Sequence, residues 1–397
     1  MVRPEAEALQ IVDVYDGPES SGFGIYGTSP ESPDGKRLCY VIYDSEEGGR
    51  LRICGSDLTD HRDLVKFHRE RTPYHNGAHA FWVDNDRLAY RSDAHLYVLD
   101  ANTGERLYGP FYLPDTTTHV SRDNKIIFFG FVGKDRALWE LDCDTGQIRQ
   151  ITTLARVVSQ EIAAGTEISD EMHHIQPNPS NTRVFFRHAN KHETPISSIL
   201  VKDGGLFVPF PRKKPMHFLW YDDDTIMGVN WNFPTWVHQP MDVDAFKEAS
   251  KNHYYQRWHI NGGVIETLAG PITHGAGSPD RQWYAGETAD YGESPIELAL
   301  YRKGQVEPTA VIFAHEFAEL TWKKRVHVNP SFSRDGRRLY FWRAVSDDRF
   351  KAGFVDLSEL IDRHVQVDEA RADANPVPTE PRAFTVSPTK DNHGNGK

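Results

Sequence analysis

A short turn motif that recurs seven times constrains the fold of this chain more than any other feature. Each copy is four residues long and rich in Asp, Asn, Pro and Gly, the residues whose backbone preferences suit tight turns. The copies are SPDG at 32–35, VDND at 83–86, SRDN at 121–124, NPSN at 178–181, YDDD at 221–224, SPDR at 278–281 and SRDG at 333–336.

A run of β-branched and aromatic residues follows each turn at once, for example RLCYVIY after the first and KIIFFGF after the third. A second run often follows and ends in a hairpin signal, as in LYVLDANTGE at 96–105. Strand, turn, strand and hairpin in this order are typical of a four-stranded propeller blade. Seven copies therefore predict an all-β protein, a seven-bladed β-propeller.

The rest of the chain is expected to complete a single propeller over residues 1–365. Residues 9–15 (LQIVDVY) precede the first turn, and we expect them to supply the outer strand of the last blade, because closure removes exposed sheet edges. The extra length at 232–256 indicates an insertion in blade 5 with one short helix. Residues 366–397 are polar, and we expect them to form a tail that wraps or is disordered.

Charge and composition limit the kinds of molecule and the cellular setting that we expect for this chain. The net charge of −12 argues against nucleic acid, which needs a basic face. The sequence contains no run of 18 apolar residues that would predict a membrane span. Its first ten residues lack the apolar segment of a signal peptide. The three cysteines have no CxxC spacing. We therefore expect a cytoplasmic protein, a monomer or a weak homo-oligomer.

Histidines recur at one position relative to the turns. Four residues before the turn stand His79, His174, His217 and His274, and in blade 7 Asn329, with His327 two residues earlier on the same strand face. The strand before the turn is the innermost strand of a blade, so these side chains are expected to face the central channel. A single histidine there is most simply a core residue bonded to a carbonyl. The shared register favours a functional centre, because packing alone does not require histidine and could be achieved by Val, Ala or Ser.

Two kinds of chemistry fit such a centre. Imidazoles with an amide and water bind divalent metals such as Mn, Fe, Ni or Zn, and His274, His327 and Asn329 come from adjacent blades. The alternative is a site without metal, in which histidine carries protons. The residues themselves leave both open.

Three segments resemble one known family. RVHVNPSFSRDGRRLYFW at 325–342 is similar to its H-P-H-P-S-F-x-x-D pattern, MHFLW at 216–220 to T-H-E-F-W, and ITHG at 272–275 to its S-H segment. The family is the oligogalacturonate lyases, seven-bladed propellers of bacterial pectin breakdown. The specific motifs cover blades 5 to 7 only.

The resemblance implies a divalent metal, with manganese as first candidate, and a histidine base beside an arginine. In that family three histidines and one glutamine hold the metal. By resemblance His217 is the base, and His274 and His327 are metal ligands. The third histidine position falls on Asn329, and the glutamine position on Lys324. The arginine falls near Ser198 and is missing.

The expected function is therefore a lyase that cleaves an anionic, uronic-acid-containing oligosaccharide by β-elimination. His217 is the expected base and His174 the expected acid. A metal, or Arg325 with Lys324, would neutralise the substrate carboxylate, and His79 is expected to bind the sugar.

Other functions stay open. A non-catalytic binding propeller of the WD40 or TolB type would not need histidines facing the channel. A metal-free propeller lyase on a different uronate glycan would be built around His75, Asn76 and His95 in blade 2. No GxSxG motif supports a peptidase, and the inner strands show no carboxylate pair for glycoside hydrolysis at the histidine register.

Overall fold

The structure is a computed structural model of the 397-residue chain. The residues that it describes are 9–25, 27–45, 48–68, 79–113, 121–153, 155–156, 159, 171–189, 196–202, 206–209, 215–230, 254–270, 272–288, 297–314, 328–346 and 349–374. They fall into two compact units, residues 1–357 and 358–397.

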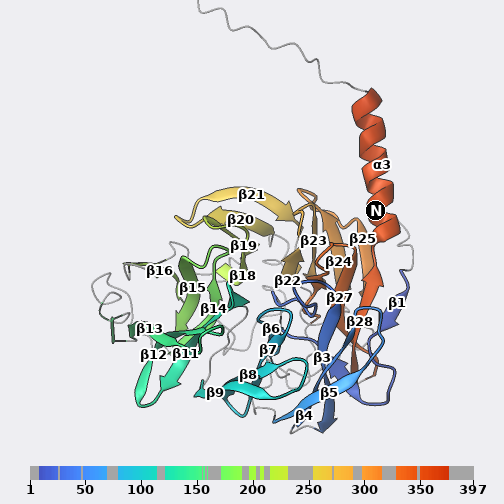
Figure 1. Ribbon diagram of the computed structural model, residues 1–397. Coiled ribbons are helices and arrows are strands. Elements are labelled where there is room, and N and C mark those ends of the chain that lie inside the picture. The colour runs from blue at the N-terminus through green and yellow to red at the C-terminus, as the bar shows by residue number, and fades with distance from the viewer. Residues whose placement is uncertain are drawn as a thin grey trace, which may run out of the picture. The chain divides into compact units, whose positions relative to one another are not determined.

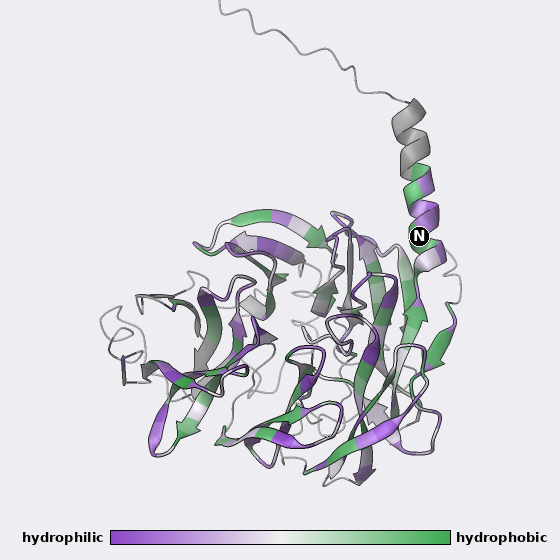
Figure 2. Ribbon diagram, in the orientation of Figure 1, coloured by the Kyte–Doolittle hydropathy of each residue, from purple (hydrophilic) through white to green (hydrophobic). Residues whose placement is uncertain are grey.

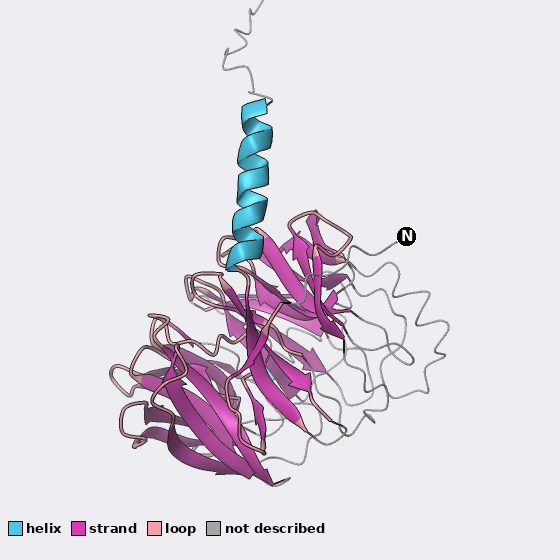
Figure 3. Cartoon of the chain, turned by 90° about the vertical axis from the view of Figure 1, so that its right-hand side faces the viewer, coloured by secondary structure: helices cyan, strands magenta, loops and turns pink. Residues whose placement is uncertain are grey.

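The first unit is built from antiparallel strands, and Figure 3 shows how much of it is strand. The twenty-eight strands described there form five sheets of four strands and one of eight. The large sheet consists of two four-strand groups, joined where Phe131 pairs with Tyr112. The strand pairing thus gives seven groups of four, as predicted, and we number them blades 1 to 7.

The blades are made of consecutive strands, except that the last blade takes its outer strand from the N-terminal end. Blade 1 consists of β2 (Ser20–Gly22), β3 (Arg37–Ser45), β4 (Gly48–Gly55) and β5 (Arg62–His68); blade 2 of β6 (Phe81–Trp82), β7 (Arg87–Ser92), β8 (His95–Asp100) and β9 (Arg106–Tyr112); blade 3 of β10 (Ser121–Arg122), β11 (Lys125–Val132), β12 (Asp135–Asp142) and β13 (Ile148–Thr153).

The remaining blades follow the same order of inner to outer strand. Blade 4 consists of β14 (Glu171–Pro177), β15 (Arg183–Ala189), β16 (Ile196–Val201) and β17 (Leu206–Pro209); blade 5 of β18 (Pro215–Trp220), β19 (Thr225–Asn230), β20 (Tyr255–His259) and β21 (Val264–Ala269); blade 6 of β22 (Ile272–Gly277), β23 (Trp283–Thr288), β24 (Glu297–Arg302) and β25 (Ala310–Ala314); blade 7 of β26 (Ser331–Phe332), β27 (Arg338–Ala344), β28 (Phe350–Asp356) and β1 (Ile11–Asp13).

The blades follow one another in a closed ring (Figure 1). Strands of neighbouring blades contact each other from blade 1 to 2, 2 to 3, 3 to 4, 5 to 6, 6 to 7 and 7 to 1. Blades 4 and 5 are joined by hydrogen bonds from Gln176 Nε2 to the Phe218 carbonyl and from Trp220 Nε1 to the Gln176 carbonyl. Ile11 pairs with Val355, so the expected closure by residues 9–15 is confirmed.

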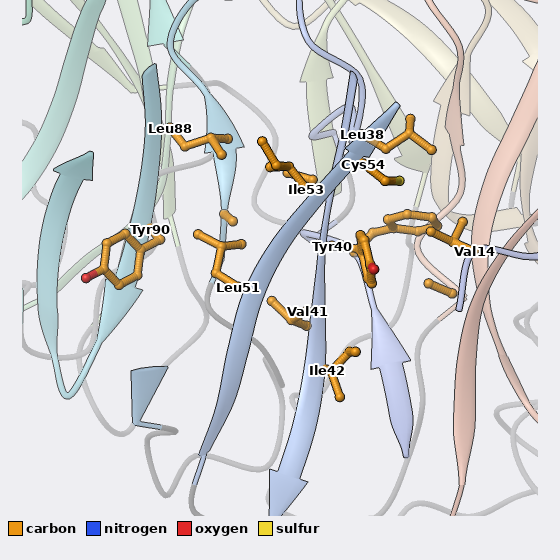
Figure 4. Packing of buried hydrophobic residues seen from close by; sticks show 14 of the residues in the cluster. Val14, Leu38, Tyr40, Val41, Ile42, Leu51, Ile53, Cys54, Leu88 and Tyr90 are labelled. Atoms are coloured by element: carbon orange, nitrogen blue, oxygen red, sulfur yellow. The ribbon is translucent and has the colours of Figure 1, made fainter. Parts of the chain in front are cut away.

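Apolar side chains fill the space between blades. One cluster of buried residues runs through blades 7, 1 and 2 and includes Tyr40, Leu51, Leu88 and Tyr340. Figure 4 shows the first three of these among their neighbours. Figure 2 shows hydrophobic and hydrophilic residues mixed along the strands, as expected where one part of each strand packs and another faces water. Each fully buried large side chain contributes about 1.5–3 kcal/mol.

The recurrent turns are stabilised by their own side chains. Ser32 Oγ donates to Asp34 Oδ1 at 2.6 Å, and Ser333 Oγ to Asp335 Oδ1 at 2.6 Å. The carboxylate in turn accepts a backbone N–H two residues later, from Lys36 and from Arg337. These bonds explain why Ser and Asp recur in the motif.

The second unit differs from the sequence-based expectation. A helix, α3 (Ser358–Ala374), crosses the boundary expected at residue 365, and residues 366–374 are helical where a tail was predicted. The segment contains no Pro or Gly and has Glu359 in its first turn, which favours a helix N-terminus. Of the insertion expected at 232–256, residues 232–253 lie outside the described residues, and Tyr255 already belongs to β20. Among the described helical residues, none form a helix long and apolar enough to cross a membrane.

Candidate functional site

Five of the residues singled out by the sequence share one backbone conformation. Their φ angles are positive and nearly equal: His79 44°, His174 52°, His217 54°, His274 43° and Asn329 44°. Left-handed backbone is uncommon outside glycine, is enriched for Asn and His, and costs about 1–3 kcal/mol per residue. The chain therefore bends in the same way at the same register in five blades.

The bend also interrupts strand pairing. The register between first and second strand shifts between His173 and Gln176 in blade 4, Met216 and Leu219 in blade 5, and Thr273 and Ala276 in blade 6. A bulge of this kind re-aims a side chain out of the regular alternation of the strand. In blade 1 the positive-φ residue ahead of the turn is Gly27 (79°).

Three of these histidines are buried, with exposed fractions of 8% for His79, 9% for His217 and 4% for His274. His174 and Asn329 are partly buried. Lys324, Arg325 and His327 lie outside the described residues, as do His75 and Asn76. His95 belongs to the alternative site predicted in blade 2, and it lies on the third strand of that blade. Its Nδ1 is 2.6 Å from the Asp93 carbonyl oxygen.

The structure brings two of the predicted residues into contact. The rings of His217 and His274, from blades 5 and 6, have centroids 3.8 Å apart and planes inclined by 32°. The contact brings an imidazole of blade 5 beside an imidazole of blade 6, that of His274.

A buried carboxylate that the sequence analysis missed supports this histidine. Glu287 on β23 is 1% exposed, and its Oε2 lies 3.1 Å from His274 Nδ1. An ionised carboxylate only accepts, so Nδ1 is the donor and Nε2 is the nitrogen that can bind or accept a proton. Glu287 Oε1 also accepts the backbone N–H of Val328, the residue before Asn329.

Glu287 thus connects the bend of blade 6 with the segment that leads into blade 7. The sequence contains a signal for it, a lone acidic residue in the run WYAGET, where the blade pattern calls for buried residues. Its partner could not be read from the sequence, because the bulge after Thr273 changes which residues lie opposite each other.

The described residues do not by themselves fit the expected manganese site. Among them, no group of three or more His, Cys, Asp or Glu side chains could hold a metal ion. His274 has the carboxylate support that is typical of metal-binding histidines, but the other expected ligand histidine, His327, is among the residues not described.

The fold and the strand order define a β-propeller, and solved propeller structures are similar to it. One is an oligogalacturonate lyase from Vibrio parahaemolyticus, 12% identical, with a TM-score of 0.63 over 89% of this chain and 95% of that one. A second is an oligogalacturonate lyase in complex with manganese, 13% identical, with a TM-score of 0.59 over 90% of this chain and 98% of that one.

A prolyl endopeptidase is also similar, at 9% identity and a TM-score of 0.51, and this chain covers 48% of it. No protein-family model and no curated protein matches the sequence. The likeness shows the propeller fold, over nearly the full length of both lyases, which is the fold that the motif resemblance implied.

Proposed function

We propose that the protein is a lyase that cleaves a uronic-acid-containing oligosaccharide by β-elimination, with His217 as the base. The observation that carries the proposal is the contact between His217 and His274, both on left-handed bends, with Glu287 behind His274. Imidazoles are the side chains most often used as general bases, and the Glu287 carboxylate fixes the ring of His274 beside that of His217. Oligogalacturonate is the first candidate substrate, because it is named for both similar lyases.

The elimination transfers two protons, one from C5 to the base and one from the acid to the leaving oxygen, and it redistributes two electron pairs. The imidazole of His217 takes the proton from C5, and the C–H electrons delocalise towards the adjacent carboxylate. They then form the C4–C5 double bond as the C4–O bond breaks. The leaving oxygen needs a proton, which we assign to His174 on the bend of blade 4, with His79 on blade 2 binding the sugar. No redox partner is required.

The substrate carboxylate must be neutralised before the C5 proton becomes acidic enough. The candidates from the sequence are Arg325 with Lys324, or a divalent metal with His274, His327 and Asn329 as its residues. Elemental analysis of purified protein distinguishes them: a stoichiometric metal supports the second, and full activity in excess chelator contradicts it.

His217→Gly tests the proposal, because glycine keeps the left-handed bend and removes only the imidazole. We expect turnover to fall by about 10²–10⁴, the usual contribution of a general base, with the melting temperature little changed. Turnover is followed by the ultraviolet absorbance of the unsaturated uronate product. The matched control is His68→Gly, which removes an exposed imidazole from the outer strand β5.

Near-full activity of the His217→Gly variant would contradict the role of this residue. If no uronate saccharide yields an unsaturated product with the wild-type protein, the lyase proposal is wrong, and a propeller that only binds its partner takes its place.

A further inference from the structure

A row of aromatic side chains crosses the sheet where blades 2 and 3 are joined. His95 on β8 lies opposite Tyr112 on β9, and Tyr112 lies opposite Phe131 on β11. The row ends on β12, where Arg136 lies opposite Phe131. Directly opposed residues of neighbouring antiparallel strands point to the same face of a sheet. Four neighbouring strands, labelled in Figure 1, therefore present three rings and one cation in a line.

Two-residue turns fix this register. Asp93 and Ala94, both left-handed with φ angles of 50° and 59°, connect β7 to β8. Two left-handed residues are typical of the type I′ turn, whose twist matches that of the strands it joins. Residues 133–134 connect β11 to β12 with a turn of the same length. Because a slip of one residue would move a strand's side chains to the opposite face, these turns hold the row on one face.

The rings of the row contact one another. The ring centroids of His95 and Tyr112 are 5.3 Å apart, and those of Tyr112 and Phe131 are 5.7 Å apart. Tyr97, two residues after His95 and on the same face, extends the row, with its centroid 6.3 Å from that of His95. Tyr112 is 44% exposed, and the other three rings are partly exposed. We call Tyr97, His95, Tyr112 and Phe131 the aromatic row.

An arginine lies at each end of the aromatic row. The Cζ atom of Arg136 is 5.9 Å from the ring centroid of Phe131, and that of Arg106 is 5.9 Å from the ring centroid of Tyr97. Among the described residues, neither guanidinium group has an ion pair, and Arg136 Nε is buried without a hydrogen-bond partner. The acid next to Arg136, Asp135, points to the other face of β12, because side chains alternate along a strand.

Aromatic rings that face water in a line are suited to sugars. The C–H groups on one face of a pyranose ring are apolar and slightly positive, and they pack on the negative face of an aromatic ring. The spacing of the rings is similar to the length of one sugar in an extended chain, so successive rings can each contact one sugar. Guanidinium groups bind carboxylates through two parallel hydrogen bonds. A saccharide that carries carboxylates therefore matches both the rings and the arginines.

We propose that the aromatic row, with Arg106 and Arg136 at its ends, is a second saccharide-binding surface, for a chain of sugars that carries carboxylates. Tyr112 lies on the outermost strand of blade 2, three strand spacings or about 14 Å from the inner strand that follows His79. The surface is therefore separate from the bends, and it holds a long polymer beside the site that cleaves it. The choice of a uronate as the sugar rests on the proposed function.

Electrophoresis in native gels cast with and without polygalacturonate tests the proposal. The His217→Gly protein is used, so that the polymer is not cleaved during the run. We expect polygalacturonate to slow this protein, and the added change Tyr112→Ala to weaken the affinity about 5- to 10-fold, because one exposed ring is lost. Tyr112→Phe keeps the ring and should keep the affinity. Arg136→Gln should weaken the binding and make it less sensitive to salt.

Leu107→Ala is the matched control, since it removes an exposed apolar side chain of the same strand that does not belong to the aromatic row. It should keep the affinity of the parent protein. A Tyr112→Ala protein that binds polygalacturonate as tightly as its parent would overturn the proposal. Equal slowing by oligothymidylate would also overturn it, because the surface would then bind any polyanion. So would a wild-type dimer that Tyr112→Ala dissociates, because the row would then be a contact between copies.

Cleavage of short oligogalacturonates separates this proposal from the lyase proposal. A short substrate does not reach the aromatic row, so Tyr112→Ala in the otherwise wild-type protein should cleave it at the wild-type rate. Binding of the polymer as expected, without any unsaturated product, would contradict the lyase proposal and support this one. Cleavage of the short substrate by a protein that polygalacturonate does not slow would support the lyase proposal and overturn this one.

Discussion

The two ends of the inner strands place opposite demands on the residues that occupy them. At the bends the backbone is left-handed, so only Gly, Asn, Asp and His are well suited, and the chain has four histidines and one asparagine there. At the second turn position the backbone accepts Pro, Asp and Arg alike. A histidine at a bend therefore meets a requirement of the backbone in addition to any chemical role, whereas the backbone does not restrict the residue at the second turn position.

Each end has a buried carboxylate that joins two blades. At the histidine end Glu287 bonds to His274 and to the Val328 N–H. At the turn end Glu31 accepts the Arg334 N–H and the Tyr340 hydroxyl. The two ends therefore differ in what the backbone demands of the residue, and the following predictions test that contrast.

Removal of the Glu287 carboxylate should have the largest effect. Glu287→Ala leaves the buried Val328 N–H without its acceptor and removes the carboxylate partner of His274, so we expect a loss of about 3 kcal/mol in the free energy of unfolding. Urea unfolding followed by fluorescence measures it. A loss below about 0.5 kcal/mol would mean that the bends hold their shape without this cross-link.

The Glu287→Gln variant separates the role of Glu287 in orienting the His274 imidazole from its contribution to the stability of the fold. The amide oxygen can still accept from Val328, but the amide N–H₂ would face His274 Nδ1, so the imidazole proton would move to Nε2. We expect a smaller loss of stability and a 10- to 100-fold loss of activity, typical of residues that orient a functional histidine. Nitrogen NMR of the imidazole reports the tautomer, and an unchanged tautomer would contradict the positioning role.

The sequence predicted most of the fold because its repeat is local. Each turn motif and the strand after it can be recognised from a few residues, and the count of seven led directly to the strand pairing that the structure shows. The closure by Ile11–Asp13 followed from the need to protect sheet edges. The helix Ser358–Ala374 was missed because its polar composition resembles that of a disordered tail.

The site was predicted less completely, for a physical reason. Counting back from the turn found His79, His174, His217, His274 and Asn329, since the repeat keeps their register. It could not find the contact between His217 and His274, which depends on how two blades pack. Nor could it pair Glu287 with His274, because a bulge displaces the pairing between the strand of Glu287 and β22.

A pair of substitutions at one bend measures the cost of the left-handed backbone. His79→Gly and His79→Ala both remove the imidazole, but only alanine is strained at a φ of 44°. We expect the alanine variant to be less stable than the glycine variant by about 1 kcal/mol, measured by urea unfolding. Equal stabilities would show that the bend relaxes when histidine is absent and that the backbone does not restrict the residue there.

The smallest effect is expected in a turn. Asp84 accepts the N–H groups of Asp86 and Arg87 and pairs with the Arg87 guanidinium. In Asp84→Asn the amide oxygen can still accept both N–H groups, so only the ion pair is lost, at a cost of about 0.2–1 kcal/mol in the free energy of unfolding. High salt should reduce the difference from the wild type, because it screens the ion pair in the wild-type protein. A loss larger than the difference between the alanine and glycine variants of His79, or one that does not change with salt, would mean that the turns are constrained as tightly as the bends.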